Sequence, residues 1–179
     1  GSVSHGEVEL GKQVVDTLGG RTILVVGAGK MSELTAKHLV SQGVRSVLVA
    51  NRTYDRAVEL AERFEGEAIR YEDLFTRMHT ADIVISSTGA PGFVITKDAV
   101  APAMRGRRSP LFFIDIAVPR DVDPAVNDLA NVFVYDIDDL GGVGESNLEA
   151  RMREATEAEV TSHHESAEFA RGGGGGTGA

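Results

Sequence analysis

The run from Ile23 to Ser32, which reads ILVVGAGKMS, restricts the fold more than any other part of this chain. Its first residues are apolar and β-prone, glycines follow at Gly27 and Gly29, and a helix-forming stretch begins near Lys30. A glycine pair between a strand and a helix permits a tight turn and leaves no Cβ between a ligand and the backbone. The helix that follows directs its free N–H groups at an anion. The run therefore predicts a strand, turn and helix that bind the pyrophosphate of a dinucleotide.

The third glycine of the usual fingerprint is replaced by Ser32, whose small side chain still permits close packing of the helix on the strand. The alternative is that Gly27 and Gly29 only form a tight turn. The residues that we expect around the phosphates are Gly27, Ala28, Gly29, Lys30, Met31 and Ser32.

The next apolar segment, Val47 to Ala50, indicates which dinucleotide is bound, because it delivers Asn51, Arg52 and Thr53 to the adenosine ribose. NAD-binding domains usually carry an Asp or Glu at this position for the ribose 2′-hydroxyl, whereas residues 51–53 of this chain include neither. Arg52 instead offers a planar fork to a 2′-phosphate, Thr53 offers a hydroxyl, and Arg56 lies one helical turn beyond Arg52. We therefore expect NADP(H) rather than NAD(H). The alternative is that both arginines are solvated surface charges, and for Arg56 the two interpretations weigh equally.

Alternating β-prone and helical segments predict a doubly wound α/β domain with a parallel sheet in the order 3-2-1-4-5-6. The expected strands are Thr22 to Val26, Val47 to Ala50, Ala68 to Arg70, Asp82 to Ser86, Leu111 to Ile116 and Val132 to Tyr135. The expected helices are Lys30 to Gln42, Tyr54 to Phe64, Tyr71 to His79, Thr96 to Met104 and Pro124 to Leu129, with an extra helix at Glu7 to Leu18. The cofactor would lie across the carboxyl ends of the strands.

Two further turns fall on that edge of the sheet. The first, SSTGAP, begins at Ser86 and is interpreted either as an ordinary polar turn or as a loop whose hydroxyls bond a ribose. In the second interpretation Ser87, Thr88 and Gly89 contact the cofactor. The other turn, Ile116 to Asp121, should border the nicotinamide, and it includes the contact residues Ile116, Ala117 and Val118.

Charged residues near the second turn have several possible roles. We expect Asp115 to orient the loop by hydrogen bonding rather than to donate a proton, because hydride transfer is the cofactor's own chemistry. For Arg120, binding of an anionic substrate and pairing with a neighbouring carboxylate weigh equally. The acidic cluster Asp136, Asp138 and Asp139 is interpreted as a capping and hinge element in preference to a metal site.

Composition excludes several classes of function. The 179 residues contain 42% hydrophobic residues and no run near the roughly 20 apolar residues of a membrane span. With no signal-peptide pattern, a cytoplasmic protein without membrane contact is expected. The absence of cysteine excludes disulfides, cysteine-ligated zinc and a thiol nucleophile. A net charge of −9 disfavours a general nucleic-acid surface.

Six motifs spread over residues 3–140 together resemble one family. They are VSHGEVEL, VVGAGKMS, VANRT, ADIVISSTGAP, FIDIAVPRDVDP and VYDIDDL. In this order they resemble the NADPH-binding domain of glutamyl-tRNA reductases, and ANRT and SSTG also occur in shikimate-dehydrogenase-like domains. The resemblance implies NADPH-dependent reduction of glutamyl-tRNA to glutamate-1-semialdehyde, through a thioester on a catalytic cysteine, in tetrapyrrole (porphyrin and haem) biosynthesis. It also implies that Gly27 to Ser32 bind the cofactor phosphates, Asn51 to Thr53 the adenine ribose phosphate, and Thr88, Gly89 and Ile116 to Val118 the nicotinamide end.

The catalytic cysteine of that family belongs to an N-terminal domain that also provides most of the tRNA recognition, and this sequence has no cysteine. We therefore expect the chain to bind NADP(H) and to be inactive by itself, and we assign no catalytic residue and no metal ligand. His79, His163 and His164 fall on expected helices far from the strand ends, where a histidine that faces the solvent is the better interpretation.

Beyond the expected cofactor domain, residues 1–140, the composition changes. Gly141, Gly142 and Gly144 predict a hinge, and Glu145 to Arg171 is expected to form a long helix with a thin apolar stripe. Together these residues, 141–171, form the expected linker. By the resemblance, that helix leads to a C-terminal domain through which the family forms homodimers. Residues 172–179 are Gly-rich and expected to be a flexible tail.

Two other functions stay open at this point. A shikimate-dehydrogenase-like oxidoreductase would need a substrate domain with a catalytic Lys and Asp, and only 22 residues precede Ile23. A non-catalytic NADP-binding module would instead use the nucleotide to regulate assembly through the helix from Glu145 to Arg171.

Overall fold

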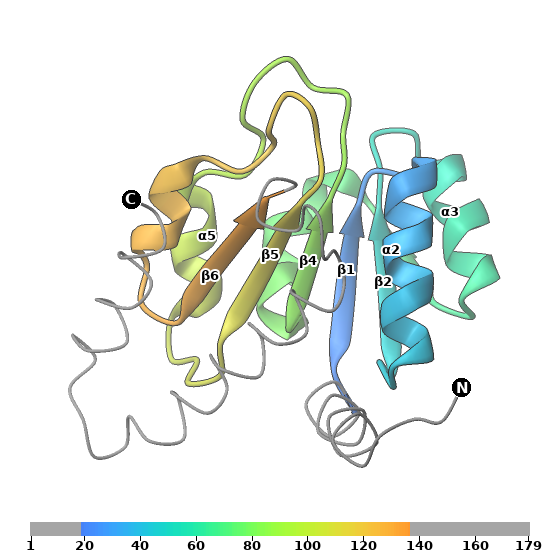
Figure 1. Cartoon of the computed structure of the whole chain (residues 1–179), viewed down its shortest axis with the longest axis horizontal. Coiled ribbons are helices and arrows are strands. Elements are labelled where there is room, and N and C mark those ends of the chain that lie inside the picture. Colours follow the sequence, from blue (N-terminus) through green and yellow to red (C-terminus); the bar gives the residue numbers. More distant parts are fainter. Residues whose placement is uncertain (1–18, 137–179) are drawn as a thin grey trace, which may run out of the picture.

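A computed structural model describes residues 19–136 of the chain, drawn in colour in Figure 1. The described part forms a parallel sheet in the order β3-β2-β1-β4-β5-β6, which confirms the predicted topology. The strands are β1 (Thr22–Val26), β2 (Ser46–Ala50), β3 (Glu67–Ile69), β4 (Ile83–Ser86), β5 (Leu111–Asp115) and β6 (Val132–Asp136). The helices include α2 (Lys30–Ser41), α3 (Tyr54–Arg63), α4 (Leu74–Arg77) and α5 (Lys97–Met104). The expected helix at Glu7 to Leu18, the hinge, the long helix and the tail lie outside the described residues.

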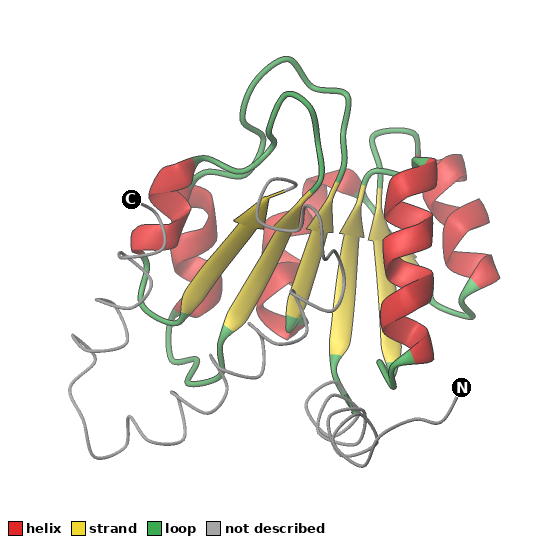
Figure 2. Ribbon diagram, viewed as in Figure 1, coloured by secondary structure: helices red, strands yellow, loops and turns green. Residues whose placement is uncertain are grey.

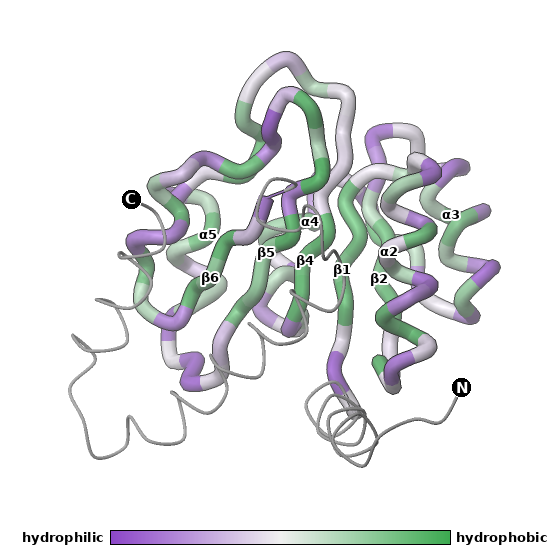
Figure 3. Tube along the Cα trace, in the orientation of Figure 1, coloured by the Kyte–Doolittle hydropathy of each residue, from purple (hydrophilic) through white to green (hydrophobic). Residues whose placement is uncertain are grey.

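Both faces of the sheet are buried because successive side chains of a strand point to opposite sides. In β1, Ile23 and Val25 belong to the core on the side of α2 and α3, whereas Leu24 and Val26 belong to the core on the side of α4 and α5. Figure 2 shows helices in front of and behind the sheet, and Figure 3 shows the apolar residues concentrated along its central strands. This arrangement explains why β1 is continuously apolar rather than alternating.

The strand register places the carboxyl ends of the central strands at one level. Val26, the last residue of β1, pairs with Ala50 at the end of β2 and with Ser86 at the end of β4. Ser86 in turn pairs with Asp115 at the end of β5. The strand order runs outward from β1 to β3 on one side and from β4 to β6 on the other, so it reverses between β1 and β4. At such a switch point the loops after the two strands lead to opposite faces of the sheet, and a crevice is expected between them.

The predicted helix from Tyr71 to His79 is wrong as one continuous element. The structure has a 3-10 turn at Tyr71–Asp73, then α4, then a second 3-10 turn at Met78–Thr80. The Thr80 hydroxyl donates to the carbonyl of Arg77 at 2.7 Å, and the His79 ring nitrogen Nδ1 lies 2.6 Å from the carbonyl oxygen of Thr76. Side chains therefore occupy carbonyls that a continuing helix would use for its own N–H groups.

The remaining boundaries differ only in detail. The predicted helix from Pro124 to Leu129 is a 3-10 helix, Pro124–Asp128, that begins where the Asp123 carboxylate accepts the N–H of Ala125. Asp82 was expected to start a strand, but β4 begins one residue later. Its carboxylate instead accepts the backbone N–H of Thr22 at 2.8 Å. Among residues 19–136, no helix combines the length and apolar character needed to cross a membrane.

Candidate cofactor site

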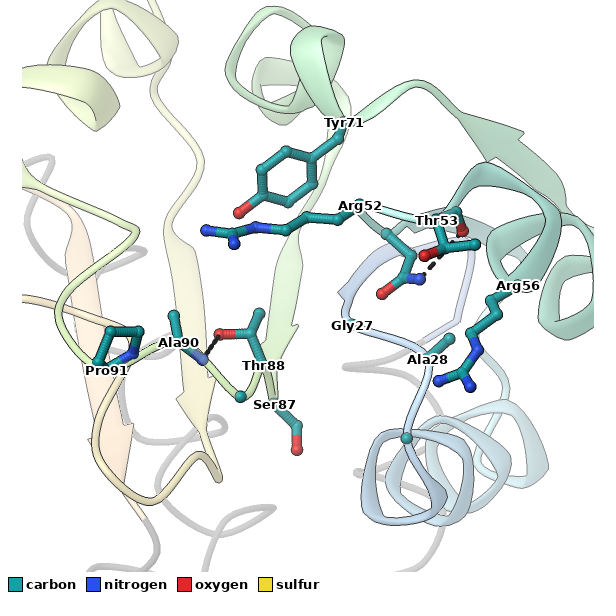
Figure 4. A pocket seen from close by; sticks show the side chains of 13 residues that line it. Gly27, Ala28, Arg52, Thr53, Arg56, Tyr71, Ser87, Thr88, Ala90 and Pro91 are labelled. Carbon is teal, nitrogen blue, oxygen red and sulfur yellow. Dashed lines mark hydrogen bonds between the residues drawn. The ribbon is translucent and has the colours of Figure 1, made fainter.

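A cleft of about 420 Å³ opens where the crevice was expected, at the carboxyl ends of β1, β2 and β4 (Figure 4). Thirteen residues line it, and ten of them were predicted from the sequence to contact a cofactor. These ten are Gly27, Ala28, Gly29, Asn51, Arg52, Thr53, Arg56, Ser87, Thr88 and Gly89. The other three are Tyr71, Ala90 and Pro91.

The two glycines of the turn serve different purposes. Gly27 has a φ of +96°, and a Cβ there would lie 2.4 Å from the carbonyl oxygen of Ser87, so the fold itself requires this glycine. Gly29 is the N-cap of α2 with an ordinary extended backbone, and an added Cβ would meet no atom within 4 Å. The backbone conformation and the packing of the described residues would therefore both tolerate a side chain at Gly29.

Lys30, Met31 and Ser32 form the first turn of α2, but none lines the cleft. Lys30 and Met31 are exposed, and the Lys30 ammonium lies 3.5 Å from Glu33. Ser32 is fully buried, and its hydroxyl has no hydrogen-bond partner within the described residues. Its small side chain therefore occupies the tight space between α2 and the sheet, as the sequence predicted.

The end of β2 gives the cleft a positive charge. Arg52 and Arg56 both line it, and no Asp or Glu is among the lining residues. The Asn51 amide donates to the carbonyl of Thr53 at 3.0 Å and so holds the loop that leads into α3. In Figure 4 the Arg52 side chain extends below Tyr71 toward the loop after β4, while Arg56 lies beside Ala28. The two guanidinium groups thus occupy different parts of the cleft.

Tyr71 is a lining residue that the sequence analysis missed. The Arg52 guanidinium carbon lies 5.7 Å from the centre of the Tyr71 ring, and Arg70 stacks on Tyr54 at 3.8 Å. Both contacts are cation–π pairs, which restrict where an arginine can point. The predicted strand order contained the signal, because it places the residues after β3 next to those after β2.

Asp121 holds the loop after β4 in place by hydrogen bonds, a role that the sequence analysis also missed. Asp121 is fully buried, and its carboxylate accepts the Ser86 hydroxyl at 2.7 Å, the Thr88 backbone N–H at 2.8 Å and the Thr88 hydroxyl. Two hydroxyls of the SSTG run are thus engaged within the protein. Ser87, half-buried in the cleft wall, has a hydroxyl without a hydrogen bond inside residues 19–136.

Asp115 orients the loop after β5, as the sequence predicted. Its carboxylate accepts the backbone N–H groups of Ala117 at 3.1 Å, Asp121 at 3.0 Å and Val122 at 2.8 Å. Burial raises the pKa of Asp115 above its usual value, although these three N–H groups favour the ionised form. Ile116 and Ala117 are buried, and Val118 is 79% exposed. None of Ile116, Ala117 and Val118 lines the cleft, so their contact with nicotinamide stays a prediction.

The remaining candidate residues lie away from the cleft. Arg120 forms an ion pair with Asp136 at 2.6 Å, which supports the neighbouring-carboxylate alternative. His79 is exposed in the middle of the 3-10 turn Met78–Thr80, as expected for a histidine that faces the solvent. Asp138, Asp139, His163 and His164 lie outside the described residues. Residues 19–136 contain no group of three or more His, Cys, Asp or Glu side chains placed to hold a metal ion.

Comparison with known proteins gives two kinds of relatives. The profile of the shikimate / quinate 5-dehydrogenase family matches residues 9–143. The chain is 50% identical to glutamyl-tRNA reductase of Geotalea daltonii, over 94% of this chain and 39% of that protein. It is 53% identical to glutamyl-tRNA reductase of Brevibacillus brevis, over 94% of this chain and 37% of that protein. The chain thus spans about two fifths of the length of these relatives.

Solved structures of glutamyl-tRNA reductases also match this chain. Glutamyl-tRNA reductase from Methanopyrus kandleri matches with a TM-score of 0.70 and 45% identity, over 96% of this chain and 43% of that one. The nucleotide binding domain of glutamyl-tRNA reductase from Thermoplasma volcanium matches over 84% of this chain and 98% of its own length, with a TM-score of 0.53. At 23% identity, this second match shows the fold alone. The chain therefore belongs to the shikimate / quinate 5-dehydrogenase family, and over most of its length it is similar to one segment of glutamyl-tRNA reductases.

Proposed function

We propose that this chain is the NADPH-binding domain of a glutamyl-tRNA reductase, which supplies the hydride that reduces glutamyl-tRNA to glutamate-1-semialdehyde in tetrapyrrole biosynthesis. The observation that carries the proposal is a cleft at the topological switch point with two arginines and no carboxylate among its lining residues. The reaction named in the proposal is that of glutamyl-tRNA reductases, to which the chain is 50–53% identical.

The residues of the cleft fit the parts of NADPH in order. The space beside Gly29 and the start of α2 suit the pyrophosphate, because backbone N–H groups there have no side-chain cap. Arg52 suits the adenosine 2′-phosphate, which an Asp or Glu at the same place would repel, and Arg56 adds positive charge beside Ala28. When bound, the cofactor would supply a hydride. The loop from Ser87 to Pro91 would hold its nicotinamide half.

Cofactor preference tests this proposal. NADPH should bind more tightly than NADH, and Arg52→Ala should weaken NADPH binding about 10- to 100-fold while changing NADH binding less than about threefold. That range corresponds to the loss of one hydrogen-bonded charge pair, about 1.4–2.7 kcal/mol. The Arg108→Ala variant is the matched control, because Arg108 is exposed in the connection between α5 and β5 and does not line the cleft. Equal affinity of the unchanged chain for NADPH and NADH would refute the 2′-phosphate assignment.

The activity itself should need more than this chain. The resembled family forms a thioester on a cysteine, and this sequence contains none. We therefore expect no semialdehyde when the chain is mixed with glutamyl-tRNA and NADPH. In the relatives, the same cleft would face a thioester formed elsewhere in the protein, together with the tRNA. Semialdehyde production by the chain alone would show that the reaction uses another nucleophile.

A further inference from the structure

Asp121 connects three separate segments around the nicotinamide half of the cleft. Its carboxylate accepts the Ser86 hydroxyl at the end of β4 and both the N–H and the hydroxyl of Thr88. Its carbonyl oxygen accepts the N–H groups of Val94 at 2.8 Å and Ile95 at 3.0 Å. One buried residue therefore forms hydrogen bonds with both ends of the loop between β4 and α5.

The same residue is itself held from β5. The Asp121 N–H donates to the Asp115 carboxylate at 3.0 Å, and the next residue, Val122, forms a bridge with Ile95. The loops after β4 and β5 rise side by side above the sheet in Figure 1, and these contacts join them. Because every donor to Asp121 comes from these loops or from the strand ends, the position of the loop after β4 depends on this carboxylate.

This arrangement decides which hydroxyl of the SSTG run is available to a ligand. The single hydroxyl proton of Thr88 is donated to Asp121, and its oxygen also accepts the N–H of Ala90 at 3.3 Å. The Ser86 proton is likewise donated to Asp121. Ser87 lines the cleft between them, and its hydroxyl has no partner in the part of the chain that the structure describes.

We infer that Asp121 is a positioning residue for the nicotinamide half of the cofactor, and that it orients the loop so that Ser87, not Thr88, donates a hydroxyl hydrogen bond to the cofactor. The inference rests on the proposed function, since it assumes that NADPH lies in this cleft. Asp121 itself is completely buried and does not line the cleft, so it acts through the loop.

Two probes separate this inference from the proposed function. Adenosine 2′,5′-bisphosphate has the adenosine half of NADPH with its 2′-phosphate but no nicotinamide, whereas NADPH has both halves. Both should bind the unchanged chain. Failure of the bisphosphate and NADPH to bind it would refute the proposed function, whatever the variants do.

In Asp121→Asn, one acceptor oxygen is replaced by an NH₂ group that faces donors, so the loop loses its fixed position. We expect the bisphosphate to bind within about twofold of the unchanged chain and NADPH to bind about tenfold more weakly, a change of about 1.4 kcal/mol. The change in NADPH emission on binding should also be smaller. The matched control is Asp123→Asn, because among residues 19–136 the Asp123 carboxylate accepts the N–H of Ala125 alone, and Asp123 does not line the cleft. Equal NADPH affinity in Asp121→Asn and the control would overturn the inference.

Ser87→Ala provides a second test that does not depend on the folding of Asp121→Asn. Ser87→Ala should weaken NADPH binding about three- to tenfold, the loss of one hydrogen bond of about 1 kcal/mol, without a change in melting temperature. Thr88→Val removes the hydroxyl that donates to Asp121 and should lower both the melting temperature and the affinity for NADPH. Normal NADPH affinity in Ser87→Ala would overturn the assignment of Ser87.

Discussion

Gly27 and Gly29 lie two residues apart in one turn, yet alanine should affect them in opposite ways. Gly27 has a φ of +96°, and an L residue in this region costs about 1–2 kcal/mol. Its Cβ would also lie 2.4 Å from the Ser87 carbonyl oxygen and 2.9 Å from the carbonyl carbon. Movement of that backbone should cost a further 1–3 kcal/mol, roughly. Gly27→Ala should therefore lower the free energy of unfolding by about 2–5 kcal/mol, a large part of the roughly 5–15 kcal/mol typical of a domain.

At Gly29 the corresponding terms nearly cancel. Its backbone, with φ −81° and ψ 171°, suits any residue, and no atom lies within 4 Å of an added Cβ. Alanine restricts the unfolded chain, which stabilises the fold by about 0.4–1 kcal/mol, whereas alanine is a poorer N-cap than glycine by about the same amount. The net change in stability should stay within about 1 kcal/mol. The methyl group would, however, occupy the space proposed for the pyrophosphate, and NADPH should bind about tenfold more weakly or worse.

Two measurements check both glycines. Urea denaturation followed by far-ultraviolet circular dichroism gives the free energy of unfolding, and titration followed by NADPH emission gives the affinity. The chain has no tryptophan, so energy transfer from indole to the cofactor does not contribute to this signal. Gly92→Ala is the control, because a Cβ there meets no atom within 4 Å and Gly92 does not line the cleft. Unchanged stability in Gly27→Ala would refute the close contact with Ser87, and unchanged NADPH affinity in Gly29→Ala would refute the position of the pyrophosphate.

Two further predictions concern stability and pH. Asp115→Asn should lower the free energy of unfolding by about 2–4 kcal/mol at neutral pH, because one of three buried backbone N–H groups loses its acceptor and faces an NH₂ group. Burial raises the pKa of Asp115, so the folded state holds the carboxyl proton more tightly than the unfolded state does. The contribution of this carboxyl group to stability therefore falls as the pH rises from about 3.8 through the raised pKa. The advantage of Asp115 over Asn should thus shrink across that window in denaturation curves, and an advantage that grows with pH there would contradict the sign. The exposed pair of Glu67 and Arg77 (2.9 Å) should show a coupling of only about 0.5 kcal/mol in a double-mutant cycle at pH 7, made with Glu67→Gln and Arg77→Gln. Because Arg77 lowers the pKa of Glu67, that coupling should be present above the usual Glu pKa of 4.5 and disappear as pH falls through the lowered value; a coupling that increases in acid would contradict this.

The order and nature of the main elements were readable from the sequence. The apolar segment of β1 and the glycines after it indicated a parallel strand that enters a helix, and regular alternation predicted the sheet order that the structure shows. The cleft residues after β1, β2 and β4 followed from the same logic, since parallel strands deliver their carboxyl ends to one edge. In these cases the relevant signal is local, because hydrophobic period, glycine and helix start act within a few residues of one another.

Interactions between distant segments needed the tertiary structure. Arg52 contacts Tyr71 only because β3 lies beside β2, and Asp121 holds Thr88 across 33 positions of the chain. The sequence marked both Thr88 and Asp121 as part of nearby turns but could not say that one binds the other, and it left Gly27 and Gly29 equivalent. The structure separates them: Gly27 is required by the backbone of Ser87, and Gly29 by nothing within the described protein. Local pattern fixes where the chain turns, but the direction in which a side chain is held depends on donors and acceptors that only packing brings together.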